Sequence, residues 1–230
     1  MAITFIAAGT AVAGILTTMD LVAPSLAEND IIIAQLSSND NDAVALPSTA
    51  WTIINELNNG TGLRSSVAWK RALLADSGAT FQFTGLAGTT VNFGVLTVYR
   101  GVRPHGPATG TNTSSANASA DAVTYATLTP LHNAGVIVAC GHYQEDLTTA
   151  GALTTFTNVV DVETPTGNDL SLFQYFIQSN GTATGAISHT TTSTVDAVNN
   201  GILFDLIPAS EPTGGDSPTY ARLERGGRRG

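Results

Sequence analysis

The sequence is poor in cysteine, in charge and in long apolar runs, and each shortage narrows what the protein can be. Its 230 residues include one cysteine, Cys140, so an intramolecular disulfide and a paired-cysteine zinc site are excluded. A lone cysteine in an apolar run is expected to be a small buried hydrophobe in a protein folded in a reducing cytosol. No apolar run has the length of a membrane-spanning helix. No Lys or Arg precedes Arg64, so we do not expect Met1–Leu26 to be a signal peptide.

Charge is scarce and unevenly placed. Charged residues make up 12% of the chain and the formal net charge is −9, so we do not expect the body to bind nucleic acid. Four arginines lie in the last segment of the chain, after a Pro-, Gly- and Ser-rich linker: Arg222, Arg225, Arg228 and Arg229. We predict that residues 211–230 form a flexible basic tail. Its arginines are the candidate contacts with an acidic partner, and a disordered solubilising end is the alternative.

Short apolar runs bounded by turn residues are abundant. Between residues 30 and 102, five runs of strand length are rich in β-branched and aromatic residues, and a similar series follows between 135 and 207. Four pairs of positions are related by an offset of 105 (136 − 31, 156 − 51, 170 − 65, 184 − 79): Ile31 and Val136, Trp51 and Phe156, Ser65 and Leu170, Ala79 and Thr184. Self-similarity over such a period indicates a repeated structural unit.

These patterns predict an all-β fold, a jelly-roll-like antiparallel β-sandwich built from two similar sequence halves. We predict a single sandwich over residues 1–210, with half one at about 3–102 and half two at about 122–208. The segment 103–121, rich in Pro and Gly and then in Ser, Thr, Asn and Ala, is predicted to be a connecting loop on the surface. We expect this loop to reach a neighbouring subunit.

Motifs of catalysis and of cofactor binding are absent from the sequence. It has no nucleophile elbow, phosphate loop, dinucleotide fingerprint or helical zinc motif. The histidines are scattered, and each is expected at the surface or in a turn: His105, His132, His142 and His189. His142 with Glu145 and Asp146 is the nearest approach to an acid/base cluster, and no activated nucleophile accompanies it. We predict no catalytic residue, no cofactor and no enzymatic activity.

Three further patterns are weighed as alternatives. The acidic turn 39–42, which the offset aligns with 144–147, offers hard oxygen atoms suited to calcium but lacks the Gly and distal Glu of the helix-loop-helix calcium motif, so we favour a solvated turn and no metal site. Glu56 and Glu163 are the candidate carboxylates of a glycosidase, which in a retaining enzyme lie about 5–5.5 Å apart. The aromatic candidates for binding glycan are Trp51, Trp69, Tyr143 and Tyr175, although strand alternation places Trp69 in the core.

The order of the strand motifs resembles a β-sandwich family common in virion proteins of tailed bacteriophages. The segments that carry the likeness are A-E-N-D-I-I-I-A-Q-L, P-S-T-A-W-T-I-I, S-S-V-A-W-K-R-A-L, A-T-F-Q-F-T-G and V-L-T-V-Y-R-G-V. Asn29-Asp30 stands where that family has Gly-Asp, and Thr49-Ala50-Trp51 stands where it has x-Gly-Trp. Tyr99-Arg100-Gly101-Val102 matches directly, and the likeness covers roughly residues 3–208.

The resemblance implies a structural virion protein. In this family the first expectation is a capsid decoration (cement) protein, made in the host cytoplasm and placed on the capsid surface of the virion. Its expected partners are the major capsid protein and further copies of itself, as a homotrimer, with no nucleic acid and no membrane among them. A protein that binds only the assembled shell stabilises that shell by linkage. The alternative is a tail or fibre module that binds host-surface glycan.

Overall fold

The computed structural model describes residues 2–60, 62–103, 109–120, 122–144, 153, 155–163, 170–190 and 197–209. In these residues the chain forms strands β1 to β15 and one short 3₁₀ helix, η1 (Leu74–Asp76), and the strands of each sheet pair antiparallel. The predicted all-β sandwich is therefore confirmed. None of the helical structure in this part of the chain is long and apolar enough to cross a membrane.

The first large sheet uses strands from the N-terminal half of the chain only. Its order is β1-β8-β4-β6-β5, and β2 pairs with a second part of β8. The strands are β1 Thr4–Ala8, β2 Val12–Ile15, β4 Ile31–Ser38, β5 Trp51–Asn59, β6 Leu63–Arg71 and β8 Val91–Arg100. Every residue of β4 is buried, as the nearly continuous apolar run in its sequence predicts for a central strand that is covered on both faces.

The second large sheet uses only strands from later in the chain, in the order β12-β13-β11-β15-β9. Its strands are β9 Thr109–Ala120, β11 Val136–Tyr143, β12 Thr157–Glu163, β13 Ser171–Gln178 and β15 Ala197–Leu206. The predicted connecting loop 103–121 is wrong over Thr109–Ala120, because these residues form β9. Their small polar side chains have weak strand propensity, but pairing with β15 supplies the backbone hydrogen bonds that decide their conformation.

The strand orders of the two large sheets correspond. β1, β8, β4, β6 and β5 take the same places in the first sheet as β9, β15, β11, β13 and β12 take in the second. The central strands β4 and β11 differ by 105 residues at both ends (136 − 31 and 143 − 38). This order agrees with the repeat that the sequence predicts, whereas the likeness of the two sequence halves remains a prediction.

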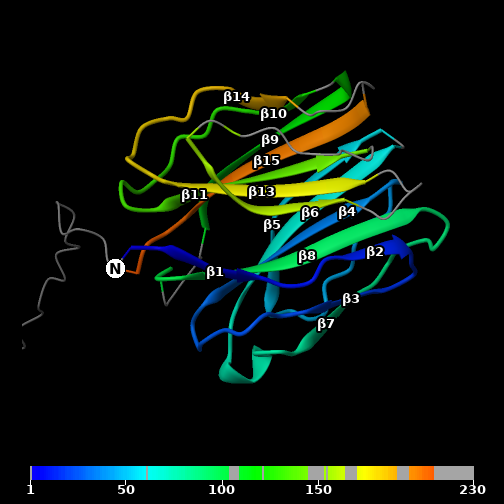
Figure 1. The fold of residues 1–230 in the computed structure, drawn as a ribbon, viewed down its shortest axis with the longest axis horizontal. Coiled ribbons are helices and arrows are strands. Elements are labelled where there is room, and N and C mark those ends of the chain that lie inside the picture. Colours follow the sequence, from blue (N-terminus) through cyan, green and yellow to red (C-terminus); the bar gives the residue numbers. More distant parts are fainter. Residues whose placement is uncertain are drawn as a thin grey trace, which may run out of the picture.

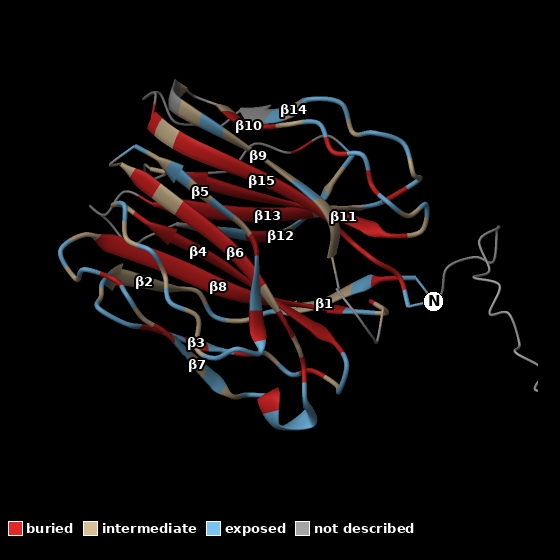
Figure 2. Cartoon of the chain, turned by 180° about the vertical axis from the view of Figure 1, so that it is seen from behind, coloured by how far each residue is buried: buried red, intermediate tan, exposed pale blue. Residues whose placement is uncertain are grey.

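The fold has four layers, because each large sheet also carries a two-stranded sheet on its outer face (Figure 1). β3 (Met19–Val22) pairs with β7 (Thr80–Phe83) beside the first sheet, and β10 (Ala122–Tyr125) pairs with β14 (Ile187–Thr190) beside the second. Alternate residues of one strand therefore enter different cores. Figure 2 shows the consequence, since the inner strands β4, β8, β11 and β15 are buried along nearly all of their length, whereas the edge strands β5 and β9 are not.

Four apolar clusters fill the spaces between these layers, and one of them joins residues of both halves near β2 and β12, including Phe93 and Leu172. The inter-sheet core contains residues of both halves, including Ile33 and Val138. The first outer core, beneath β3 and β7, contains Ile32 and Trp51. The second outer core, beneath β10, contains Ile137. A large sheet covered on both faces needs apolar residues at nearly every position, which the sequences of β4 and β11 provide.

Backbone contact between the two halves is confined, in the part of the chain that the structure describes, to one corner. Val102 forms a bridge with Pro208, Arg103 N donates to Ile207 O at 2.8 Å, and Ala209 N donates to Gly101 O at 2.7 Å. Elsewhere the halves are held together by side chains. Each half therefore completes its own sheets, and the packing of side chains joins them.

The Asn29-Asp30 and Arg100-Gly101 motifs meet at the same end of the first sheet. Arg100 donates from Nε to Asp30 Oδ1 and from Nη2 to Asp30 Oδ2, each at 2.8 Å. Asp30 is 2% exposed, and its Oδ2 also accepts a hydrogen bond from Ala27 N at 2.8 Å. Asn29 has φ 69°, a left-handed conformation that Gly favours and Asn tolerates. The motif thus fixes the start of β4 against the end of β8, and Asn can replace Gly at its first position.

Two neighbouring residues of β15 test the layered arrangement. Leu203 and Phe204 are both 0% exposed because they enter the second outer core and the inter-sheet core respectively. We expect Leu203→Ala to lower the free energy of unfolding in urea by about 2–5 kcal/mol and Phe204→Ala by about 3–5 kcal/mol. Leu131→Ala, at a side chain 61% exposed, is the control and should change it by less than about 0.5 kcal/mol. A near-neutral Leu203→Ala would contradict the outer layer.

Candidate functional site

The structure removes most of the aromatic candidates for glycan binding from the surface. Trp51, Tyr143 and Tyr175 are buried, and Trp69 is partly buried against the inter-sheet core. Strand alternation therefore placed Trp69 correctly. Cys140 is also buried, as expected, and burial raises the pKa of its thiol to about 12. Trp51, Tyr143 and Tyr175 therefore offer no exposed ring face, and Cys140 offers no reactive thiolate.

The candidate glycosidase residues lie on strands at opposite lateral sides of the sandwich, β5 and β12. Glu56 lies on β5 and forms an ion pair with Arg64 at 2.9 Å, and the hydrogen bond from Arg64 lowers the pKa of the Glu56 carboxyl. Ser66 Oγ also donates to Glu56 Oε1, at 3.1 Å. Glu163 ends β12, whose place in the second sheet corresponds to that of β5 in the first, and β12 lies at the far edge from β9. The Glu56 carboxylate is thus held by Arg64 and Ser66 of the first sheet.

The acidic turn 39–42 uses its oxygen atoms within the protein. Asp40 Oδ1 accepts a hydrogen bond from Asn41 N, and Asp42 Oδ2 accepts one from Ala87 N, both at 2.6 Å. In the described part of the chain, no group of three or more His, Cys, Asp and Glu side chains is placed to hold a metal ion. Other predicted positions lie outside the described residues: His105, Glu145, Asp146, Arg222, Arg225, Arg228 and Arg229.

His142 departs furthest from its expected place. The sequence predicts a surface or turn residue, but His142 lies in β11 and is 0% exposed, so this prediction is wrong. Neither ring nitrogen has a hydrogen-bond partner among the described residues, and burial lowers the pKa of the imidazole to about 3. The alternation that puts Val136, Val138 and Cys140 in the inter-sheet core continues to His142, and this alternation was the available clue.

His142 belongs to a polar layer at one end of the space between the large sheets. Asn200 is its cross-strand neighbour on β15, and Asn200 Nδ2 donates to Ser65 Oγ of the first sheet at 2.9 Å. Ser65 is in turn the neighbour of Ser37. Gln35 Nε2 donates to Gly141 O at 3.0 Å and so also crosses between the sheets.

Several buried polar atoms of this layer have no partner among the described protein atoms: Gln35 Oε1, Ser37 Oγ, Thr97 Oγ1, His142 Nδ1 and Nε2, and Asn200 Oδ1. A buried polar group without a partner costs about 1–3 kcal/mol. The unpaired polar atoms therefore lower the net contribution of this layer to stability, whereas the inter-sheet core around Ile31 and Val136 is apolar.

The two lateral sides of the sandwich differ. On the side formed by β5 and β9, Asn55 Nδ2 donates to Asn112 Oδ1 and Asn59 Nδ2 donates to Asn117 O, both at 2.7 Å. These contacts close that side. On the opposite side, β1 and β2 of the first sheet face β12 of the second, and Gln178 Nε2 donates to Ile3 O at 2.9 Å near one end.

Farther along this second side, a groove of about 680 Å³ lies between β2 and β12; we call it the edge groove. Its lining residues are Thr10, Ala11, Val12, Ala13, Phe93, Asp161 and Val162. The groove accompanies a break in the edge strand, because β9 runs unbroken for 12 residues while the corresponding edge is divided into β1 and β2. Within the described residues, β2 pairs only with β8 and β12 only with β13, so one edge of each strand forms no backbone ladder with another strand.

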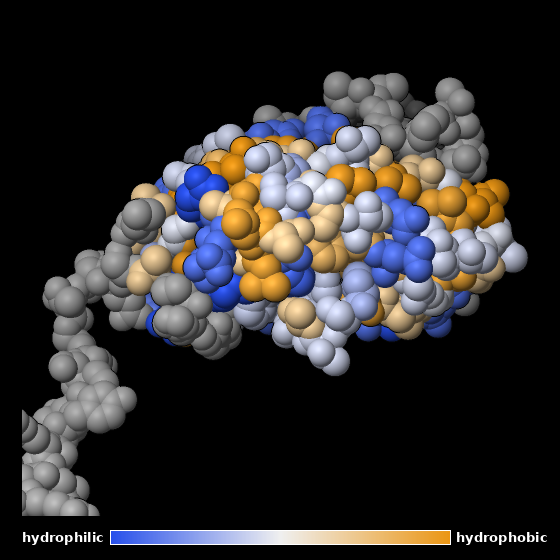
Figure 3. Space-filling model, turned by 90° about the horizontal axis from the view of Figure 1, so that it is seen from below, coloured by the Kyte–Doolittle hydropathy of each residue, from blue (hydrophilic) through white to orange (hydrophobic). Residues whose placement is uncertain are grey.

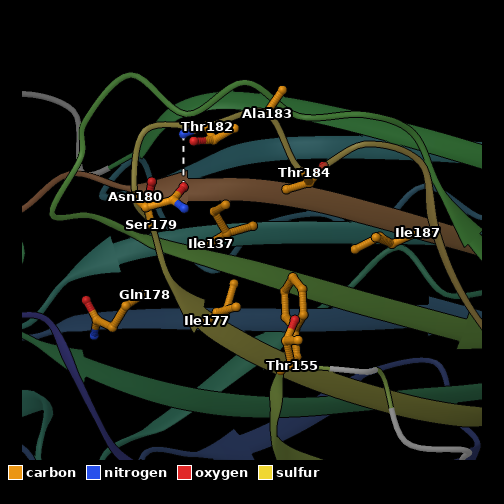
Figure 4. Close-up of a pocket in the computed structure, with 11 residues that line it drawn as sticks. Ile137, Thr155, Ile177, Gln178, Ser179, Asn180, Thr182, Ala183, Thr184 and Ile187 are labelled. Carbon is orange, nitrogen blue, oxygen red and sulfur yellow. Dashed lines mark hydrogen bonds between the residues drawn. The ribbon is translucent and has the colours of Figure 1, made fainter.

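A second hollow, the outer pocket, lies on the outer face of the second sheet beside the segment that joins β13 to β14 (Figure 4). Its volume is about 220 Å³. The lining residues carry no formal charge: Ile137, Thr155, Phe156, Ile177, Gln178, Ser179, Asn180, Thr182, Ala183, Thr184 and Ile187. Sequence reasoning missed this pocket, since hydroxyl and amide residues in a turn-rich segment look like any surface loop.

No protein-family model, no curated protein and no solved structure matches this chain. The edge groove, the polar layer and the outer pocket are therefore the features from which a function can be argued.

The burial of His142 predicts a loss of stability in acid. The unfolded imidazole binds a proton below about pH 6.5, whereas the folded one does so only near pH 3, so the unfolded state gains stability as the pH falls between these values. The free energy of unfolding contributed by His142 is fully present above about pH 6.5 and falls by about 1.4 kcal/mol per pH unit below it. Urea titrations of the native protein between pH 7 and pH 4 should show this slope.

The control is His142→Gln, which removes the titrating group while all carboxyl groups remain. The difference in unfolding free energy between the native protein and this variant should shrink as the pH falls. Parallel stability curves for the two proteins would contradict a buried, neutral His142.

Proposed function

We propose that the chain is a structural virion protein, a capsid decoration (cement) protein that binds the capsid surface and bridges neighbouring major capsid subunits. The observation that carries the proposal is the edge groove, where the edges of β2 and β12 face each other on one side of the sandwich. The resemblance of the strand motifs to phage virion sandwiches supports the same assignment.

The edge groove suits an extended polypeptide segment. A strand edge presents unpaired backbone groups that can pair with another chain, and proteins that must stay apart guard such edges with Lys, Pro or a covering element. β2 has the sequence V-A-G-I, which contains neither Lys nor Pro. We infer that an extended segment of a neighbouring subunit pairs with the groove, as in recognition by strand addition.

The exposed surface is also suited to contact. Ile15, at the end of β2, is 58% exposed, and Leu73 and Leu74 are 58% and 71% exposed. Figure 3 shows apolar and polar residues mixed over one face of the molecule. With charged residues at only 12% of the chain, few charged side chains would have to lose their water at such a contact. Many modest contacts of this kind, repeated by symmetry, suffice to strengthen a shell.

Self-association and the basic tail belong to the same proposal. A closed cyclic oligomer is the common arrangement of such subunits, and we propose a homotrimer. Arg222, Arg225, Arg228 and Arg229 would then contact an acidic neighbour through charge. The runner-up function is a tail or fibre module that binds host-surface glycan, and the uncharged outer pocket is the observation that favours it.

The number of copies per particle separates the two functions. Quantitative mass spectrometry of purified virions that contain this chain should find a copy number comparable to that of the major capsid protein. A number typical of tail components would favour the fibre module, and absence from the particles would overturn both assignments.

A substitution in the edge groove tests its role directly. Ala11→Lys places a charged side chain in the groove lining without removing any core residue, because Ala11 is only partly buried there. Binding to capsids that lack the protein, followed by co-sedimentation, should weaken at least about tenfold, equivalent to about 1.4 kcal/mol. The matched control is Thr52→Lys, at an exposed position of β5 on the closed side. Equal binding by the two variants would show that the groove is not the contact.

A further inference from the structure

The strand arrangement alone does not produce the outer pocket, because aromatic side chains fill the corresponding place in the first half. Trp51, which begins β5, is 4% exposed there, and its ring lies 5.3 Å from Phe81 and 5.4 Å from Phe83, edge to face in both cases. Phe156 stands 105 residues after Trp51 and immediately before β12 (156 − 51). A phenyl ring thus replaces an indole in the second half.

Strand register identifies the other exchanged residues. Ile32 pairs with Lys70 in the first sheet, and Ile137 pairs with Ile177 in the second, so Ile177 takes the place of Lys70.

The small outer sheets show the same kind of exchange. In the small outer sheet of the first half, Phe81 of β7 packs edge to face against Trp51, whereas in that of the second half Ile187 of β14 lines the outer pocket. Smaller side chains therefore surround the outer pocket at the positions where the first half is filled by aromatic rings and a Lys70–Asp76 ion pair.

The rim of the outer pocket is held in place by its own hydrogen bonds. Ser179 Oγ donates to His132 O at 2.9 Å, Thr182 N donates to Asn180 Oδ1 at 3.0 Å, and Leu128 N donates to Thr184 Oγ1 at 3.0 Å. Figure 4 shows Ile137, Ile177 and Ile187 around the space, with Thr182 and Thr184 on one side of it. Ligand sites are commonly preformed in this way, with an apolar lining and a few polar groups.

From this geometry we propose that the outer pocket binds one neutral sugar unit. A pyranose ring has an apolar face of C–H groups, which suits Ile137, Phe156 and Ile177, and hydroxyl groups, which suit the hydroxyl and amide rim. An anion or cation would find no opposite charge in the lining, and a purely aliphatic ligand would displace water from the hydroxyl and amide rim without replacing its hydrogen bonds. The volume of about 220 Å³ lies below the usual range for larger ligands, about 300–1,000 Å³, which limits the site to a single unit.

The outer pocket would be the binding site of the glycan-binding alternative, and its role does not depend on the edge groove. The Ala11→Lys variant should therefore keep its affinity for sugar whatever happens to its affinity for capsids. Loss of capsid binding and loss of sugar binding are measured separately, so the failure of one proposal is distinguishable from the failure of the other.

The test is a titration of the full-length protein with methyl glycosides of glucose, galactose, mannose and N-acetylglucosamine, followed by NMR. We expect saturable binding of at least one glycoside, with a dissociation constant on the order of 1 mM. Phe156→Trp should weaken this binding at least tenfold, because it restores the side chain that fills the first half, and the variant should remain folded. Thr182→Val, which keeps the size and removes one rim hydroxyl, should weaken it severalfold.

The matched control is the reverse exchange, Trp51→Phe, which should leave sugar affinity unchanged although it opens space in the first outer core. Absence of saturable binding by every glycoside would overturn the proposal. Binding that neither Phe156→Trp nor Thr182→Val weakens would also overturn it, because the sugar would then occupy another site.

Discussion

The packing of the two large sheets against each other is the constraint on which the rest of the structure depends. Each sheet is completed within its own part of the chain, so the halves are joined mainly by side chains such as Ile33, Val138 and Phe204. This contact changes character along its length, from an apolar end to a polar layer that contains His142 and Asn200. The outer two-stranded sheets follow from the same constraint, since alternate residues of β4 and β11 are apolar on both faces and both must be covered.

The functional candidates lie where the corresponding halves differ. The closed side has the continuous β9, whereas the division of the opposite edge into β1 and β2 accompanies the edge groove. Beneath the outer sheets, Trp51 and Phe81 fill one half and smaller residues leave the outer pocket in the other. Because the strand orders of the two halves correspond, the packing of one half can be compared with that of the other. Where the packing differs, the residues present are not the ones that the shared strand arrangement requires for stability.

Much of the fold was predictable from the sequence, because strands that are buried on both faces consist of nearly continuous apolar residues. The offset of 105 residues aligned Ile31 with Val136, the residues at which β4 and β11 begin. β9 was missed because the small polar residues of an edge strand resemble a loop, and only pairing with β15 makes them extended. His142 was misplaced because residue type was given more weight than alternation. The outer pocket depends on side chains that are smaller than their counterparts, which a single sequence does not reveal.

The corner where Val102 meets Pro208 has a consequence for how the molecule could be divided. Among the described strands, each large sheet takes all of its strands from its own half of the chain. The covalent link therefore acts chiefly to keep the two halves at a high local concentration. If the chain were cut between residues 103 and 109, each of the two polypeptides would retain the strands of one large sheet and an apolar inner face. Mixed together, such fragments would re-form the sandwich as a heterodimer whose assembly depends on protein concentration.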